Sequence, residues 1–556
     1  MSEKKICRNC KKDFVMESED FDFYKKIDVP PPTLCPDCRQ QRRYAWRNER
    51  VLYRRDCDLC RKNVVTIYSS NKPYKIYCTL CFWSDKWDGT DYGRDFDFSK
   101  NFFEQFYELQ LRVPRIALLS KNSVNADYTH HSSDNKNCYL CFGTFDSENI
   151  LYSTNMWGGI KKDSSDCYHV LGVAERVYEL VDSERCYGCQ YGVRLRDCTD
   201  CLYCFDCRNC SNCFLSSNLR GRQHYFLNKP YSKEDYEKKV KEYKLTSQQT
   251  RDGLYKQWLD LVKNGIHRFA VIEKSADVSG NMIINSKNSH FVFDADNVED
   301  VKYATLCTDM KDSMDFYHVG FGCELIYEGH GMTYDYDCRF VHFSYNNARL
   351  TYCDDCHNGE DLFGCVGVKQ GKFCILNKRY SEDEYRVLRN KIIAHMKKTK
   401  EFGEFFPARF SPFGYNETQG NVYMPLSKEE AITRGYRWED RVPGTFGKET
   451  LRLEEIPDDI GEVSDDILKE ALVCANCRKN YNILRPELVF YRRESLPIPR
   501  LCPDCRYMRR LKLRPPRNLW HRRCMKPGCQ NKFETPYAPE RPEIVYCETC
   551  YNAEIA

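Results

Sequence analysis

The sequence has no long apolar run. Nothing in its 556 residues approaches the ~20 consecutive apolar residues of a membrane span, and no apolar segment follows the opening Met-Ser-Glu-Lys-Lys. These absences argue against a membrane-spanning protein and against a typical exported one. We therefore expect a soluble, cytoplasmic chain with no membrane partner.

The common signatures of catalysis are missing too. The sequence contains no phosphate loop, dinucleotide fingerprint, serine elbow or HExxH motif, and no residue stands out as a nucleophile. A non-enzymatic role is therefore the main expectation. The chain is nevertheless long enough for several domains.

Cysteine and aromatic residues are abundant instead. The chain has 34 Cys, 39 Tyr and 31 Phe. In a large cytoplasmic protein, so many cysteines indicate metal binding rather than disulfides. The aromatic content favours β structure.

Positive charge is concentrated at the two ends. Lys and Arg outnumber Asp and Glu by 18 to 11 over residues 1–81 and by 17 to 8 over residues 474–556. Since the whole chain carries only +4, the middle is acidic, at −12. A polyanionic partner should therefore bind at the ends.

Cysteine pairs recur at both ends with one spacing. At each end 24 residues separate the first two pairs and 17 separate the last two. Two such pairs enclose a metal in a closed tetrahedron of thiolates, which leaves no coordination position for a substrate. The sequence therefore predicts about four structural Zn ions, held by Cys7, Cys10, Cys35 and Cys38, by Cys57, Cys60, Cys78 and Cys81, by Cys474, Cys477, Cys502 and Cys505, and by Cys524, Cys529, Cys547 and Cys550.

The first set at each end resembles a known family. Phe23-Tyr24-Lys25 lies between its pairs, and Cys35-Pro36-Asp37-Cys38-Arg39 closes the segment. The C-terminal end repeats this pattern with Phe490-Tyr491-Arg492 and Cys502-Pro503-Asp504-Cys505-Arg506. Both segments are similar to the probable zinc-ribbon domain family, which implies zinc binding without a known activity.

Arginines and aromatic residues lie between the two cysteine sets of each end, at a common offset of 467. Basic groups interleaved with aromatic rings suit phosphate contact and base stacking. Alternatively, the guanidinium groups offset the negative formal charge of a four-thiolate zinc centre. The candidate nucleic-acid-binding residues are Arg42, Arg43, Arg47, Arg50, Tyr53, Arg509, Arg510, Arg514, Arg517 and Trp520.

The middle of the chain contains an internal duplication at an offset of 149. Residues 162–170 match 311–319, and residues 227–232 match 376–381. Strand-like runs recur every ~9 to 15 residues within each copy, as is typical of a parallel β-solenoid with about two strands per turn. The middle thus resembles a duplicated cysteine- and tyrosine-rich repeat protein. The predicted fold is mainly β with added helices, a duplicated parallel β-solenoid-like core flanked by tandem zinc-ribbon modules; a twisted antiparallel sheet is the alternative.

Capping boxes that begin at Ser232, Ser381 and Ser427 predict helices behind the two copies. The predicted domains are tandem zinc modules (1–88), a connecting helix (89–121), solenoid copy 1 (122–230), a helical cap (231–268), solenoid copy 2 (269–380), a second helical cap (381–439), a linker (440–472) and tandem zinc modules (473–556).

Cysteines and histidines in the middle allow two interpretations. Cys186, Cys189 and six cysteines at three-residue intervals from Cys198 to Cys213 could bind a further metal, or could stack as small core residues. His169 and His318 occupy equivalent places and lie near aspartates. They could line the groove of a polysaccharide-cleaving solenoid or could simply be stacked rings.

The leading hypothesis is a non-enzymatic zinc-binding protein that binds RNA or a ribonucleoprotein through its basic end modules. The alternatives are a structural or protein-interaction scaffold and a carbohydrate-active β-solenoid enzyme. Self-association is a further expectation, because an acidic middle lies between basic ends.

Overall fold

The computed structural model describes residues 2–155, 161–168, 178–179, 181 and 188–555. The chain divides into two compact units, and both combine segments that are far apart in sequence. The first unit comprises Met1–Leu118, Ala270–Val442 and Arg517–Leu519; the second comprises Leu119–Phe269, Pro443–Pro516 and Trp520–Ala556. Strands predominate in both, with some helices. Each cysteine-rich end therefore shares a unit with the half of the middle that is farther from it in sequence.

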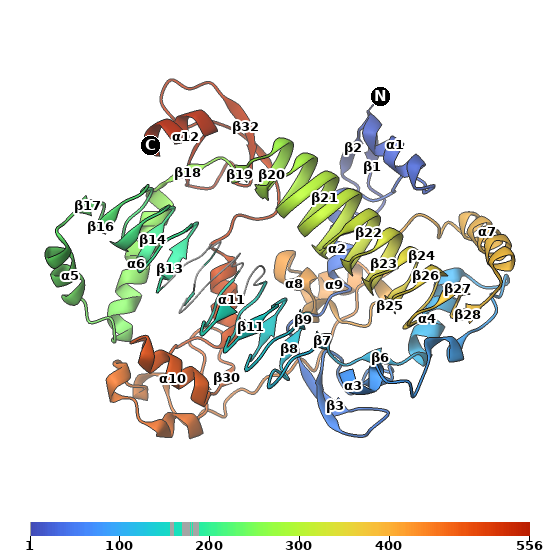
Figure 1. The fold of residues 1–556 in the computed structure, drawn as a ribbon, viewed down its shortest axis with the longest axis horizontal. Coiled ribbons are helices and arrows are strands. Elements are labelled where there is room, and N and C mark those ends of the chain that lie inside the picture. Colours follow the sequence, from blue (N-terminus) through green and yellow to red (C-terminus); the bar gives the residue numbers. More distant parts are fainter. Residues whose placement is uncertain (1, 156–160, 169–177, 180, 182–187, 556) are drawn as a thin grey trace. The chain divides into compact units, whose positions relative to one another are not determined.

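The first unit is built on a parallel ladder, here called the late ladder. Figure 1 shows its longest strands as successive turns of one winding ribbon (green to yellow). Neighbouring strands pair in parallel at an offset of about twelve residues, as in Ile326 with Cys338. Only the last pair, β27 with β28, is antiparallel. The strands are β19 (Ile272–Glu273), β20 (Ala276–Ile284), β21 (Lys287–Val319), β22 (Cys323–Thr333), β23 (Tyr336–Tyr345), β24 (Ala348–Thr351), β25 (Asp354–His357), β26 (Glu360–Phe363), β27 (Lys372–Ile375) and β28 (Lys378–Arg379).

A three-residue rhythm runs through the late ladder. From Asn288 to His318 every third residue has a positive φ, and Asn or Asp holds most of these positions. These two residue types tolerate the left-handed conformation best after glycine. From Ser289 to Phe316 the residue that follows each of them is at most 3% exposed. The left-handed residues thus act as corners of the winding chain. Each segment from one corner to the next, here called a side, is three residues long and directs one side chain inward.

The N-terminal segment and several helices complete the first unit. Two small antiparallel hairpins are each followed by a helix that begins at a cysteine pair. The elements are β1 (Glu3–Ile6), β2 (Asp13–Met16), α1 (Ser18–Lys26), α2 (Pro36–Tyr44), β3 (Tyr53–Asp56), β4 (Asn63–Thr66), β5 (Ile76–Tyr77), α3 (Thr79–Phe82), α4 (Phe102–Arg112), β6 (Arg115–Ile116), α7 (Glu382–Lys398), α8 (Gln419–Tyr423) and α9 (Lys428–Thr433).

The second unit contains a similar parallel ladder, the early ladder, at the same offset of twelve residues, as in Gln190 with Leu202. It too ends in an antiparallel pair, β16 with β17. Its strands are β7 (Ser120–Lys121), β8 (Thr129–His130), β9 (Ser132–Ser133), β10 (Cys141–Phe142), β11 (Ser147–Glu148), β12 (Lys161–Lys162), β13 (Gln190–Val193), β14 (Leu202–Phe205), β15 (Ser211–Phe214), β16 (Gln223–Phe226) and β17 (Lys229–Pro230).

The C-terminal segment and two helices cover this unit. The aromatic side chains of α6 and of the last ladder turns share one core with residues of α10 and α11. The elements are α5 (Lys233–Lys241), α6 (Gln248–Asn264), β18 (Ile266–Arg268), β29 (Leu472–Val473), β30 (Asn480–Tyr481), α10 (Arg485–Arg493), α11 (Pro503–Leu511), β31 (Trp520–Arg523), β32 (Lys532–Thr535), β33 (Ile544–Tyr546) and α12 (Glu548–Ile555).

The helices predicted from capping boxes are present. Ser232, Ser381 and Ser427 are the N-caps of α5, α7 and α9, and each hydroxyl accepts a hydrogen bond from a backbone N–H in the first turn. None of the helices in the described part of the chain is long and apolar enough to cross a membrane.

Candidate metal centres

All four cysteine sets have the same local structure. The first pair of each set lies on the turn of a short antiparallel hairpin, and the second pair lies at the start of a helix. A left-handed residue next to the hairpin pair bends the chain back in each case: Lys11, Arg61, Arg478 and Gly528. The tight turn and the helix N-terminus bring the four thiols together.

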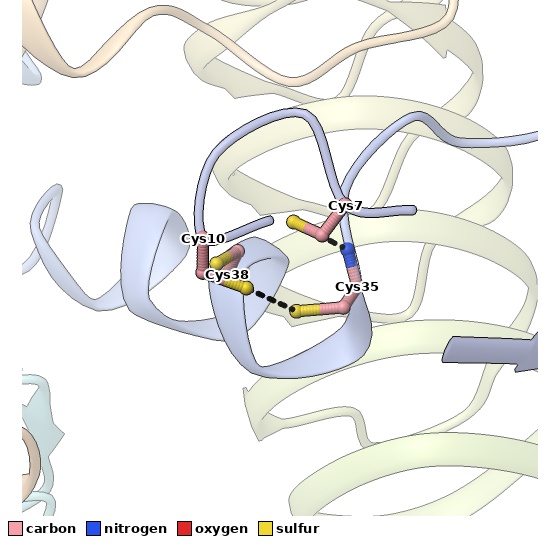
Figure 2. Close-up of side chains that lie close together, drawn as sticks. All are labelled: Cys7, Cys10, Cys35 and Cys38. Atoms are coloured by element: carbon pink, nitrogen blue, oxygen red, sulfur yellow. Dashed lines mark hydrogen bonds between the residues drawn. The ribbon is translucent and has the colours of Figure 1, made fainter. Parts of the chain in front are cut away.

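The four sulfurs of each set lie within 4.8 Å of one another, and the sets follow chain order. Figure 2 shows Cys7, Cys10, Cys35 and Cys38 gathered around one space. The Sγ atoms of Cys10 and Cys35 are 3.7 Å apart, and those of Cys60 and Cys78 are 3.8 Å apart. A tetrahedral zinc ion with Zn–S bonds of about 2.3 Å requires sulfurs about 3.8 Å apart. The geometry therefore fits zinc, and no disulfide joins the described cysteines.

A backbone N–H donates to the first sulfur of every set. The N–H of Cys35 donates to Cys7 Sγ at 3.3 Å (Figure 2), and the equivalent bonds end at Cys57, Cys474 and Cys524. Burial is the largest influence on Cys57 and raises its pKa, but N–H groups, led by that of Cys60, bring the pKa down to about 7. These N–H groups stabilise the thiolate form, which is the form that binds metal.

The arginines of α2 do not face solvent. Arg39, Arg42 and Arg43 lie on one face of α2, because they are three and four residues apart. Asp315 accepts from Arg39 at 2.8 Å and from Arg43 at 3.1 Å, and Glu328 accepts from Arg42 at 2.7 Å. The two carboxylates are fully buried and lie on adjacent turns of the late ladder. The guanidinium groups therefore neutralise acids of the ladder.

The C-terminal end makes the same contacts with the early ladder. Asp166 accepts from Arg506 at 3.0 Å and from Arg510 at 2.8 Å, and Glu179 pairs with Arg509. These arginines lie 467 residues after Arg39, Arg43 and Arg42, and the acids lie 149 residues before Asp315 and Glu328. Two ion-pair networks of one design thus join each end to a ladder.

Aromatic packing repeats across the two units as well. The rings of Phe23 and Tyr24 contact Tyr327 edge-on, with centroids 6.2 and 5.4 Å away. Tyr491 also contacts Tyr178 edge-on, with centroids 6.2 Å apart, while the ring of Phe490 is tilted against Tyr178, with centroids 6.4 Å apart. The Phe-Tyr pair that suggested a zinc ribbon therefore packs on a ladder tyrosine.

The other candidate nucleic-acid contacts also have partners within the chain. Arg47 Nη2 lies 3.0 Å from His318 Nδ1, and Arg47 is fully buried. Tyr53 Oη donates to Glu417 at 2.7 Å. Arg514 lies over the ring of Tyr168, and Arg517 pairs with Asp294 at 3.0 Å. Arg50 lies in the segment that precedes β3 and is half-buried. Trp520, the first residue of β31, is also half-buried.

The cysteines at three-residue intervals lie inside the early ladder. Each of the six from Cys198 to Cys213 follows a left-handed residue and is at most 2% exposed. Cys201 Sγ donates to the carbonyl oxygen of Thr199 at 3.5 Å and of Cys210 at 3.7 Å, and the others follow this pattern. Within the described residues, only the end modules group sulfurs for a metal; Cys186 lies outside them. The inward-facing position of a three-residue side explains the spacing.

This arrangement predicts that Cys201 and Cys204 do not contribute to metal content. Replacing both with alanine should leave about four zinc ions per chain, because four thiolate sets remain intact. Elemental analysis of the purified protein measures this number. A loss of one zinc ion, or iron in the unmodified protein, would make the ladder cysteines ligands.

The buried histidines His342 and His318 contact residues of other elements. His342 Nδ1 lies 2.8 Å from Asp354, while its Nε2 lies 2.9 Å from the carbonyl oxygen of Trp46, and the ring is fully buried. His318 is equally buried, and its nearest carboxylate is Glu49 at 3.6 Å. His169 lies outside the described residues. The His342–Asp354 pair has no access to solvent. It therefore holds the segment around Trp46 in place and does not contact a substrate.

No family model, no curated protein and no solved structure matches this chain. The clusters of four cysteines at both ends are consistent with zinc-binding modules. Their assignment to the zinc-ribbon type stays a prediction.

Proposed function

We propose that this protein is a zinc-organised scaffold, in which zinc-ribbon modules at the two ends clamp two copies of one β-solenoid. The observation that supports this function best is the repeated ion-pair network: Arg39 and Arg43 with Asp315, and Arg506 and Arg510 with Asp166. The zinc sites are closed, so their metal holds the helix that carries these arginines and has no position for a substrate.

The solenoid assignment and the duplication belong to this proposal. Residues twelve apart pair in parallel, so one turn contains about twelve residues. Because each side is three residues long, a turn has four sides, whereas the sequence led us to expect two strands per turn. Both ladders end in a hairpin at equivalent places: Tyr225 pairs with Pro230, and Cys374 with Arg379. The helices that follow begin at Lys233 and Glu382, again 149 residues apart. Such agreement supports two copies of one assembly.

The same contacts favour the scaffold over RNA binding through the arginines. Phosphate contact requires guanidinium groups that reach solvent, whereas the side chains of Arg42 and Arg43 are 9% and 1% exposed and pair with carboxylates. Breaking a buried ion pair to bind phosphate would cost several kcal/mol. Binding of RNA or a ribonucleoprotein is therefore a weaker candidate at these positions.

Replacing Arg39 and Arg43 with glutamine tests the scaffold. We expect the N-terminal modules to come away from the late ladder, so trypsin should cleave within residues 1–88 at least about tenfold faster, as a loss of 1.4 kcal/mol or more implies. Zinc content should be unchanged. Lys62→Gln with Lys86→Gln is the matched control, because both side chains are exposed in the same segment and this variant also loses two trypsin sites.

Titration with a labelled single-stranded RNA distinguishes the alternative. Binding that falls steeply with salt and disappears in Arg42→Gln with Arg43→Gln would favour RNA. Unchanged proteolysis of Arg39→Gln with Arg43→Gln would refute the clamp.

A further inference from the structure

A cavity of about 460 Å³ lies beside the first cysteine set. One candidate zinc ligand, Cys38, is part of its wall, and the rest of the wall comes from the turn of the first hairpin, from Leu34 and α2, from the start of α4, and from residues 399–409 and 434–436. All of these segments belong to the first unit. The volume lies in the range of small-molecule sites.

The rim of the cavity is strongly basic. Arg8, Lys400, Arg409 and Arg434 line it, and all four side chains are exposed. None of them forms an ion pair with any of the described residues. They come from three separate parts of the chain that meet at this cavity.

The acidic residues of the wall already have partners. Glu404 accepts from Arg42 at 2.8 Å and from the N–H of Thr33 at 3.1 Å. Glu401 accepts from the N–H groups of Phe102 and Phe103, at the N-terminus of α4. Glu404 is thus paired with a cation, whereas Glu401 keeps its negative charge, so the cavity retains a net positive charge from its four rim cations.

One donor in the wall is buried and unpartnered within the described part of the chain, as the equivalent donor of Arg509 is at the C-terminal end. The side chain of Arg42 is only 9% exposed, and its Nε has no hydrogen-bond partner among the described residues. A buried N–H without an acceptor is costly, typically by 1–3 kcal/mol in proteins.

We propose that this cavity binds a small phosphate-bearing anion. Three guanidinium groups and one ammonium group at a single cavity suit an anion with several charges, and Arg pairs with phosphate oxygens through two parallel hydrogen bonds. A loaded four-thiolate zinc centre is itself negative, so it offsets part of the rim charge but not all four cations. The zinc also holds Asn9 and Cys38 in the wall, since Asn9 Nδ2 donates to Cys38 Sγ at 3.3 Å.

The C-terminal end should lack this site. The residue equivalent to Arg8 is Ala475, although the equivalents of Asn9 and Cys38, Asn476 and Cys505, keep their hydrogen bond at 3.3 Å. The zinc environment is therefore shared while the rim charge is not. This difference predicts one phosphate site per chain.

Calorimetric titration of the zinc-loaded full chain with pyrophosphate, in about 150 mM KCl to screen exposed charges, tests the proposal. We expect binding of one pyrophosphate per chain. Arg409→Gln with Arg434→Gln should weaken it by at least about tenfold, since each lost charge-assisted hydrogen bond weakens binding several-fold or more. Arg112→Gln with Lys391→Gln removes two exposed charges outside the cavity and should leave the affinity unchanged.

Three outcomes would overturn the site: no binding, equal weakening by the control variant, or equal affinity for citrate. Zinc content measured after each titration shows that pyrophosphate has not extracted the metal. Trypsin must also cleave the rim variant within residues 1–88 as slowly as it cleaves the unmodified chain, so that loss of binding reports the cavity and not the clamp.

Discussion

Asp315→Asn is expected to lower the free energy of unfolding of the first unit by about 3–5 kcal/mol, the usual cost of breaking a buried ion pair. The variant leaves Arg39 and Arg43 with side chains 2% and 1% exposed and without their shared charge. Asparagine keeps the size of the side chain and tolerates the left-handed backbone at this position, where φ is +59°. Urea unfolding followed by circular dichroism measures the change.

Asp312→Asn is the matched control. Its φ is also positive, at +46°, but its partner Lys26 is 50% exposed. An exposed pair contributes at most about 1 kcal/mol, so this variant should unfold nearly as the unmodified chain does. The equivalent change in the second unit, Asp166→Asn, should resemble Asp315→Asn. Equal, small effects for all three variants would mean that the buried network contributes nothing to stability.

Removal of zinc is expected to unfold the end modules. Apparent folding free energies from structural zinc are about 10–16 kcal/mol per site near neutral pH, far more than small hairpins and short helices provide. Chelation should release about four zinc ions per chain, one for each cysteine set. It should also expose residues 1–88 and 473–556 to proteases. Elemental analysis and proteolysis followed by mass spectrometry measure both effects.

A single ligand change refines this test. Cys35→Ser should remove about one zinc ion and open the first module, because three thiolates cannot close the tetrahedron. Cys138→Ser changes a buried cysteine of the early ladder and should leave the metal unchanged. If chelation released no zinc, or left both ends resistant, the sulfur clusters would not be structural metal sites.

The metal-site residues could be predicted because cysteine spacing acts locally. A hairpin pair and a helix-start pair come together whatever the rest of the chain does, so the sets of four follow from position alone. The helices behind Ser232 and Ser381 were predictable for the same reason, since a cap depends on three neighbouring residues.

The three-residue side was visible in the sequence but was not recognised there. Cys198 to Cys213 recur every three residues, and Asn or Asp precedes several of them. This pattern has neither the period of a helix nor that of an extended strand. The sequence therefore left two interpretations open, a metal motif and stacked small core residues, and the positive φ before each buried cysteine agrees with the second.

Cysteine pairs, caps and the repeated segments were determined by residues close together along the chain, and these could be read directly from the sequence. Tertiary structure alone decided what the arginines do, because Arg39 and Asp315 are 276 residues apart and no local pattern joins them. Burial then decided their chemistry. A guanidinium group that is buried beside a carboxylate stays paired with it, because separating the two costs several kcal/mol. The same arginines exposed on a surface would have been able to contact phosphate.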